Sequence, residues 1–525
     1  MSTIRSSALV ALGTAASRAT GLLRLAALAY ALGFTRLTDT YNLANTTPNI
    51  VYELILGGVL SATLVPVFVA GRERGDDRAA SAVVSVAGVV LVALTVAGVL
   101  AAPAIVRLYT LSTGGAEAAA QRDVAAYLLR LFMPQMLFYG ITAMATALLH
   151  AHRRFTVPAV TPVLNNLVVS ATFFALPHLT GGRPTLAGAR DDTGLLLLLG
   201  LGTTAGIAVM ALAMLPSMRR AGIRLRPVFD WRHPAVRTVL SLSGWTAGYV
   251  AANQVALWVV LILANGTAGG VSAYQGAFIF FQLPHGLVAV SLMTTLAPDL
   301  ASAASRTDLG VFRQRFFSGL RMMAVVMLPA AAGYVVLARP IVSFLLERGA
   351  FSAGDSDQTA ACLALFAVGL VPFSLYLYAL RGFYAFQDTR TPFFLNCFEN
   401  GANIVLALVL EPLMGVRGLA LAYSAAYGLA AVVSLRSLER RCRASEAPAV
   451  LRWRRMLVRM ALAAGLVAGA VRMLLWILPE SAPSVVKVLA GTVVGVLVYV
   501  PALRAMRVPE VGEVLSRLRS RTTPR

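Results

Sequence analysis

Two arginines lie inside the first apolar run of the sequence. Arg18 and Arg24 are six residues apart, which on an α-helix is roughly 9 Å along the axis and about 120° around it. One wide polar cavity can therefore receive both. Guanidinium groups stay charged and bind phosphate through two parallel hydrogen bonds, so the pair favours a ligand that carries pyrophosphate. Asp39 follows at the outer end of the next apolar run. The alternative is that Asp39 only pairs with an arginine and ties the first two helices together.

A second polar group lies in a late apolar run. Glu399 and Asn403 are four residues apart, so they share one face of a helix. Asn253, in an earlier run, is a candidate partner. Oxygen ligands of this kind can hold Na⁺, and a carboxylate can instead carry a proton. The alternative is a neutral Glu399 that is hydrogen-bonded in a polar interior. Apart from this candidate cation site, we expect no metal and no cofactor.

The elements that position these residues are membrane helices. The chain has 525 residues, of which 58% are hydrophobic and 13% charged, with a mean hydropathy of +0.74. Such a chain lacks the polar surface of a soluble protein, and about 20 apolar residues cross a bilayer. The sequence predicts an all-α polytopic membrane protein with about fourteen helices. We place them at 7–33, 40–70, 80–109, 124–150, 157–178, 194–217, 236–264, 271–302, 316–338, 357–380, 392–411, 417–436, 455–477 and 485–506.

Arginine is concentrated in the even-numbered connections between these helices. Short arginine-rich loops stay on the cytoplasmic side, so both termini are predicted to be cytoplasmic. We predict an N-terminal lobe of six helices, a basic linker, a C-terminal lobe of six helices, two further helices, and a basic cytoplasmic tail. Their ranges are 1–217, 218–235, 236–437, 438–506 and 507–525.

The sequence also contains an internal repeat. Segment 53–66 aligns with 285–298 at an offset of 232 residues, and 145–166 aligns with 380–400 at an offset of 234. The agreement in offset favours duplication of a six-helix unit, which predicts two parallel lobes around a central cavity. Pro48, with Gly57 and Gly58, predicts a bend in the second helix, and Pro284 with Gly286 predicts a similar one in the eighth. The alternative for each proline is a role in packing alone.

Several classes of function are excluded by what the sequence lacks. The formal charge is +22, yet the basic residues lie in short loops between apolar runs, so we expect no nucleic-acid partner. Lys487 is the only lysine, so no GxxxxGK[ST] phosphate loop exists. Cys362, Cys397 and Cys442 are too few and too scattered for a metal site or a disulfide framework. We predict that the chain is not an enzyme.

Three stretches resemble the MurJ (MviN) lipid II flippases of the multidrug/oligosaccharidyl-lipid/polysaccharide exporter superfamily. They are 16–68, HAHRRFTVPAVTPVLNN at 150–166, and 338–393 with its ERGAF and GFYAFQDTRTP motifs. The resemblance covers essentially the whole chain. It implies a multi-pass protein of the bacterial inner membrane that moves lipid II, an undecaprenyl-pyrophosphate-linked peptidoglycan precursor, outward by alternating access. It also implies contacts with membrane lipids and other cell-wall synthesis proteins.

The resemblance assigns substrate binding to Arg18, Arg24 and Asp39. This chain departs from many Gram-negative members in helix 2, where it has Tyr52 and Gly57, with a carboxylate at Glu53. In helix 8 their charged cluster is replaced by Phe278, Ile279 and Gln282. These differences are similar to those of the actinobacterial branch.

Two alternatives stay open at this stage. One is a superfamily exporter of another lipid-linked glycan or of a drug, and the other is a cell-wall scaffold that does not transport. A drug exporter for cationic ligands needs carboxylates in its cavity, which Arg18 and Arg24 oppose. With no nucleotide site, the expected driving force is a Na⁺ gradient, a proton gradient or the membrane potential.

Overall fold

The computed structural model describes residues 3–54, 63–242, 244–442 and 449–506, and these are helical with no strand among them. This confirms the predicted all-α fold class. Packing divides the chain into two compact units. The first comprises Met1–Ser272 and Arg348–Ser352, and the second comprises Ala273–Glu347 and Ala353–Arg525.

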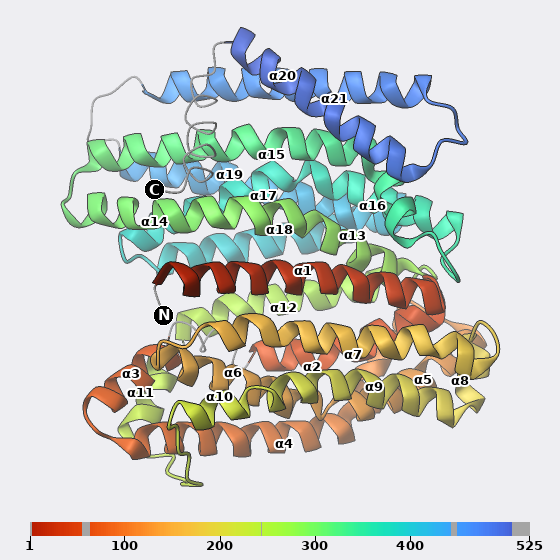
Figure 1. Cartoon of the computed structure of the whole chain (residues 1–525), viewed down its shortest axis with the longest axis vertical. Helices are drawn as coiled ribbons and strands as arrows, with labels where there is room; N and C mark the ends of the chain where they lie inside the picture. The colour runs from red at the N-terminus through yellow and green to blue at the C-terminus, as the bar shows by residue number, and fades with distance from the viewer. Residues whose placement is uncertain (1–2, 55–62, 243, 443–448, 507–525) are drawn as a thin grey trace. The chain divides into compact units, whose positions relative to one another are not determined.

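The first unit is built on long helices that pack side by side, with α1 against α7 and α7 against α9 (Figure 1). Its core surrounds Tyr41, whose ring meets Phe132 and Phe173 edge-on. The helices are α1 (Thr3–Leu32), α2 (Arg36–Tyr52), α3 (Val65–Glu73), α4 (Asp77–Tyr109), α5 (Gly115–Phe132), α6 (Gln135–Ala151), α7 (Thr156–Thr180), α8 (Leu186–Asp191), α9 (Thr193–Leu212), α10 (Leu215–Arg220), α11 (Pro234–Leu242) and α12 (Gly244–Ala264).

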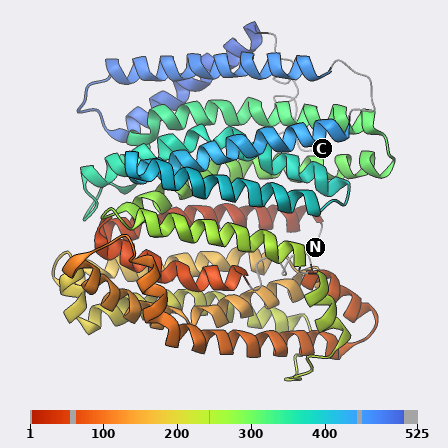
Figure 2. The same ribbon diagram turned by 180° about the vertical axis from the view of Figure 1, so that it is seen from behind.

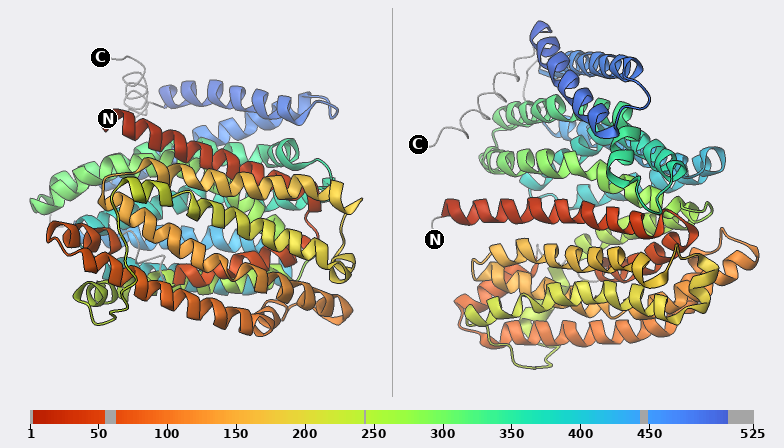
Figure 3. Two further views of the ribbon diagram at one scale, coloured as in Figure 1. Left: turned by 60° about the horizontal axis from the view of Figure 1, so that its bottom comes forward. Right: turned by 45° about the vertical axis from the view of Figure 1, so that its right-hand side comes forward.

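The second unit has α18 and α19 side by side (Figure 2). Its two C-terminal helices, blue in Figure 3, cross each other and pack on α15. The helices are α13 (Gly270–Pro284), which begins in the first unit, α14 (Val290–Ser305), α15 (Leu309–Leu346), α16 (Ala353–Val368), α17 (Leu370–Ala385), α18 (Arg390–Met414), α19 (Val416–Arg441), α20 (Ala449–Ile477) and α21 (Ser484–Ala505).

Each of the fourteen predicted spans contains helix in the described residues. Within the described ranges, eleven helices are long and apolar enough to cross a membrane, or twelve if the bent pair α16 and α17 forms one span. Helix α1 and the α2–α3 segment fall outside that set. These are the regions that carry Arg18, Arg24 and Asp39, the residues with the candidate binding chemistry.

At Pro284, where a bend was predicted, the helix changes type. Helix α13 ends at Pro284, and a π-helical turn spans His285–Ala289 before α14 begins. A π-turn holds one residue more than an α-turn and is frequent at functional sites. In the second predicted helix the backbone also becomes π-helical at Glu53, while Gly57 and Gly58 lie outside the described residues.

Three backbone features recur at equivalent positions of the predicted repeat. The π-turns begin at Glu53 and His285, which are 232 residues apart. At the same offset, the left-handed residues Gly75 and Thr307 follow helix ends. Their turns have matching backbone hydrogen bonds, since the amides of Asp76 and Asp308 donate to the carbonyls of Gly71 and Ala303.

The third feature lies at the second offset. Arg153 and Gln387 are 234 residues apart, and both are left-handed, with φ of 56° and 58°. Positive φ is uncommon outside glycine, so its recurrence at matched positions supports a duplicated backbone. The predicted two-lobe, parallel-repeat fold agrees with this geometry. The predicted domain boundaries concern the repeat, whereas the compact units reflect packing, so those boundaries stay a prediction.

Candidate functional site

Arg18 lies on a segment of α1 that α7 holds in place. The Asn166 amide of α7 donates to the Ser17 carbonyl oxygen at 3.2 Å and to the Thr20 hydroxyl at 3.1 Å. These two contacts flank Arg18, whose side chain is exposed. Asn166 appears in the sequence only as a residue of the repeat, so its positioning role was not predicted. The contact leaves the Arg18 guanidinium available to a ligand while fixing the helix that carries it.

Arg24 points toward a tyrosine in the core of the first unit. Its guanidinium lies within hydrogen-bonding reach of the Tyr41 hydroxyl and interacts electrostatically with Tyr139. The Tyr41 hydroxyl is 2.8 Å from the Thr203 hydroxyl of α9. Arg24 is half-buried, and neutral hydroxyl groups partner it without neutralising its charge. The arrangement therefore leaves Arg24 as a cation within α1.

The Asp39 carboxylate caps the start of α13 and forms no ion pair with Arg18 or Arg24 among the described residues. One carboxylate oxygen accepts hydrogen bonds from the Ser272 amide at 2.9 Å and from its hydroxyl at 2.7 Å. Ser272 lies in the first turn of α13, where amides have no partner within the helix and favour a negative charge. Among the described residues, no ion pair joins Asp39 to Arg18 or Arg24. The alternative of an Arg–Asp tie between the first two helices is therefore wrong.

A buried amide pair, which the sequence analysis missed, anchors the end of α12. The Gln121 amide donates to the Asn265 side-chain oxygen at 2.8 Å, and the Asn265 amide donates to the Tyr109 carbonyl at 3.0 Å. Arg36 donates to the Asn265 carbonyl and pairs with Glu117. All these residues belong to the first unit. No spacing signal marks this network, because its members come from distant segments.

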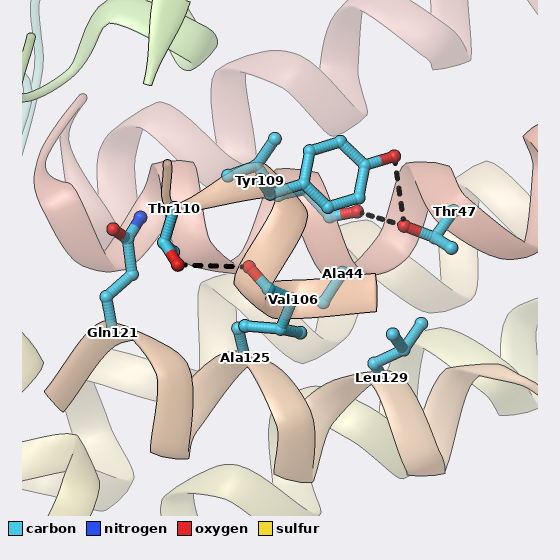
Figure 4. Close-up of a pocket in the computed structure, with 9 residues that line it drawn as sticks. Ala44, Thr47, Val106, Tyr109, Thr110, Gln121, Ala125 and Leu129 are labelled. Atoms are coloured by element: carbon cyan, nitrogen blue, oxygen red, sulfur yellow. Dashed lines mark hydrogen bonds between the residues drawn. The ribbon is translucent and has the colours of Figure 1, made fainter. Parts of the chain in front are cut away.

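Figure 4 shows a small cavity near this network. It is lined by residues of α2, α4 and α5, and the Tyr109 hydroxyl lies 3.3 Å from that of Thr47. Its volume is about 10 Å³, close to the minimum that one water molecule requires. A lipid head group cannot fit there, so this cavity is not the substrate site.

The candidate cation residues are buried on one face of α18. Glu399 is 1% exposed and Asn403 5%. The Tyr427 hydroxyl approaches the Glu399 carboxylate, but neither carboxylate oxygen has a hydrogen bond of ordinary geometry within the described residues. The same holds for the Asn403 side-chain oxygen. Asn253 lies on α12 in the first unit, where its amide donates to the Tyr249 carbonyl. Its membership of the cation site stays a prediction.

Comparison with known proteins decides the family. A family model described as Lipid II flippase MurJ matches residues 28–487. The chain belongs to the MurJ family. A probable lipid II flippase MurJ of Rhizobium tropici is 30% identical over 446 residues, which cover 84% of this chain and 82% of its own. The lipid II flippase MurJ of Burkholderia cenocepacia is 28% identical over 469 residues, covering 87% of each chain.

Solved structures share the fold. A lipid II flippase MurJ in an inward closed conformation superposes with a TM-score of 0.78 at 20% identity, covering 95% of this chain and 99% of the other. An inward-facing multidrug resistance MATE family transporter of the MOP superfamily gives a TM-score of 0.66 at 13% identity, covering 81% and 95%. MurJ membership confirms a multi-pass membrane transporter rather than an enzyme. The binding roles of Arg18, Arg24 and Asp39 stay predictions.

Tyr52 and Phe278, two of the residues at which this chain departs from the resemblance, are packed against aromatic rings. The Tyr52 and Tyr139 ring centroids are 5.4 Å apart in the first unit. In the second unit, Phe278 contacts the rings of Phe281, Phe366 and Tyr423. Ile279, beside it on α13, is 39% exposed.

This difference predicts opposite outcomes for two neighbouring alanine substitutions. Ile279→Ala should leave transport and thermal stability close to wild type, because the side chain is exposed and cannot bind a charged head group. Phe278→Ala should lower stability by about 2 kcal/mol, since it removes part of an aromatic cluster. Thermal unfolding in detergent and a flipping assay measure both effects. A loss of transport in Ile279→Ala with unchanged stability would show that α13 binds substrate.

Proposed function

We propose that this chain moves lipid II from the inner to the outer leaflet of the bacterial inner membrane by alternating access. The observation that carries the proposal is Arg24, a permanently charged and half-buried side chain whose guanidinium lies near the Tyr41 hydroxyl. Together with the exposed Arg18, it provides the guanidinium groups that a pyrophosphate requires. Exporters of cationic drugs would need carboxylates in these positions.

Complementation tests this proposal. Cells depleted of their own flippase are supplied with this chain, and lipid II on the outer leaflet is measured by its accessibility to an impermeant enzyme. We expect growth and outer-leaflet lipid II to be restored. Restored growth without outward lipid II would instead support a scaffold that does not transport.

The orientation and the partners follow from the same proposal. Both termini lie in the cytoplasm, where the arginine-rich connections face anionic lipids of the inner leaflet. These connections are also the surface through which other cell-wall synthesis proteins would bind. Impermeant labelling of single cysteines introduced near each terminus tests the orientation, which requires protection in intact cells.

The energy for resetting the empty carrier comes from an electrochemical gradient in this proposal. One elementary charge moved across 100 mV supplies about 2.3 kcal/mol. Glu399 and Asn403 offer buried oxygens that lack ordinary hydrogen bonds among the described residues, and such oxygens can bind Na⁺ or a proton. Membrane potential acting directly on the cavity arginines is the simpler rival.

Glu399→Gln distinguishes these two sources. If Glu399 binds the coupling ion, the variant should lose its response to a Na⁺ or proton gradient while still binding lipid II, because Arg18 and Arg24 are intact. Transport is measured in vesicles with Na⁺, proton and voltage gradients imposed independently. Glu411→Gln, the same change on the same helix, is the matched control. Wild-type transport driven by voltage alone and unchanged in Glu399→Gln would rule out the cation site.

A further inference from the structure

Five residues between α15 and α16 pack in a different unit from the helices that flank them. Segment Arg348–Ser352 belongs to the first unit, whereas Glu347 before it and Ala353 after it belong to the second. We call these five residues the strap. A short excursion of this kind needs specific contacts, because so few residues bury little surface.

The strap is docked on the C-terminal part of α1. The Ala350 amide donates to the Tyr30 carbonyl at 2.8 Å. The rings of Phe351 and Phe34 meet edge-on, with centroids 4.8 Å apart. Arg183, which follows α7, donates to the Gly349 carbonyl. Phe351 is 3% exposed, so the strap is inserted rather than resting on the surface.

Gly349 permits this close approach. Its φ is +63°, a left-handed conformation that glycine adopts without strain. A Cβ atom at this position would overlap the Tyr30 ring and its carbonyl oxygen. Both the backbone conformation and the available space therefore require glycine. Any larger side chain must push the strap away from α1.

The root of the strap is fixed by charges within the second unit. The Arg339 guanidinium pairs with Glu347 at 2.6 Å and with Asp357 at 2.5 Å, and Ser356 donates to Glu347 at 2.9 Å. The Ser343 hydroxyl, followed by Arg339 and Ser356, lowers the pKa of Glu347 to about 2. These interactions favour the charged Glu347 carboxylate. Their contribution to folding stability is therefore present above the pKa of the unfolded state and is lost only as pH falls toward 2. At neutral pH the root is therefore intact.

We propose that the strap is a releasable latch, which is docked on α1 in this conformation and must leave it during each transport cycle. The strap is held on α1 by the hydrogen bonds and the ring contact described above, and its root is held by the ion-pair network. The strap would therefore undock as one piece when the end of α15 and the start of α16 move. On the predicted topology this latch lies on the outer side of the membrane. The proposal rests on the proposed transport function, but docking itself can be measured without transport.

A reversible cross-link tests the need for release. Tyr30→Cys and Ala350→Cys are combined after Cys362, Cys397 and Cys442 have been replaced by alanine. The backbone hydrogen bond places the two Cα atoms within about 6 Å, which a disulfide can span. Oxidation should reduce lipid II flipping about tenfold or more, and a reductant should restore it. Equal flipping in the oxidised and reduced protein would overturn the latch.

The matched control cross-links two residues inside the second unit. A Cβ atom at Gly495 of α21 would lie 3.4 Å from the Val467 side chain of α20, so Val467→Cys with Gly495→Cys should oxidise readily and keep its activity. Equal inactivation of both pairs would assign the loss to oxidation and overturn the proposal. If the reduced proteins and the wild type all fail to flip lipid II, the proposed function fails instead.

Docking is measured separately by thiol labelling. The Ala350→Cys thiol should react slowly because residue 350 is 8% exposed. Adding Gly349→Ala should raise its labelling rate about tenfold by displacing the strap. Gly181→Ala is the control, since Gly181 has a φ of +65° with no neighbouring atom to obstruct a Cβ. Unchanged labelling in Gly349→Ala would show that the strap does not depend on this contact and would overturn the proposal.

Discussion

Replacing Arg18 or Arg24 by alanine is expected to reduce outward movement of lipid II by about 100-fold or more, because losing two charge-assisted hydrogen bonds to phosphate removes about 3 kcal/mol. Neither change opens a large void, since Arg18 is exposed and Arg24 half-buried. Insertion and thermal stability should therefore remain close to wild type. Lysine should rescue only in part, because an ammonium group cannot make the two parallel hydrogen bonds.

The measurement combines growth of flippase-depleted cells with the amount of lipid II on the outer leaflet. Arg130→Ala is the matched control, because Arg130 is an exposed arginine on α5 with no predicted binding role. It should support normal growth. Normal growth of a variant with alanine at both Arg18 and Arg24 would contradict anion binding by this helix.

Asp39→Ala is expected to have the second largest effect on transport. The cause is different, because this substitution acts through the stability of the protein. It removes the acceptor for the Ser272 amide and hydroxyl, leaving buried donors unsatisfied at the start of α13. We expect a loss of about 2–4 kcal/mol in stability, with transport reduced about tenfold or more. Asp39→Asn should lose less, because its side-chain oxygen can still accept both hydrogen bonds.

Ser272→Ala completes the comparison. It removes only the hydroxyl contact to Asp39 and should cost about 1 kcal/mol. Thermal unfolding of the four proteins in detergent should therefore rank them as wild type, then Ser272→Ala and Asp39→Asn, then Asp39→Ala. If Asp39→Asn abolishes transport while its stability is unchanged, the negative charge acts on substrate rather than on α13.

The helical fold could be predicted because its signals are local. Long apolar runs identify the spans, and Pro284 marks the π-turn, since proline removes a helical hydrogen bond at a fixed position. The repeat was visible because equal spacings persist in sequence. Helix α1 was the hardest span to predict, because Arg18 and Arg24 interrupt its apolar pattern. The same two residues are the candidate binding residues.

The contacts of the candidate site could not be predicted from the sequence. Asp39 meets Ser272 across 233 positions of sequence, and Asn166 holds α1 across 149. Neither pair has a spacing rule, because tertiary packing brings together residues from unrelated turns. The alternative that the sequence left open, an Arg–Asp tie, is absent from the described residues for this reason. The opposite charges of Asp39 and the α1 arginines suggested an ion pair. The Ser272 amide and hydroxyl at the start of α13 instead donate hydrogen bonds to the Asp39 carboxylate.

The π-helical backbone that begins at both Glu53 and His285 carries information about ancestry. π-Helical backbone is rare in proteins, so two independent origins at equivalent positions are improbable. The simplest history is that an ancestral half-length protein already contained this wide turn before its gene duplicated and fused. Arginines now lie in the opening helix of one half, and a carboxylate and amides lie on α18 of the other. Their divergence gave each half of the molecule its own chemistry on a shared backbone.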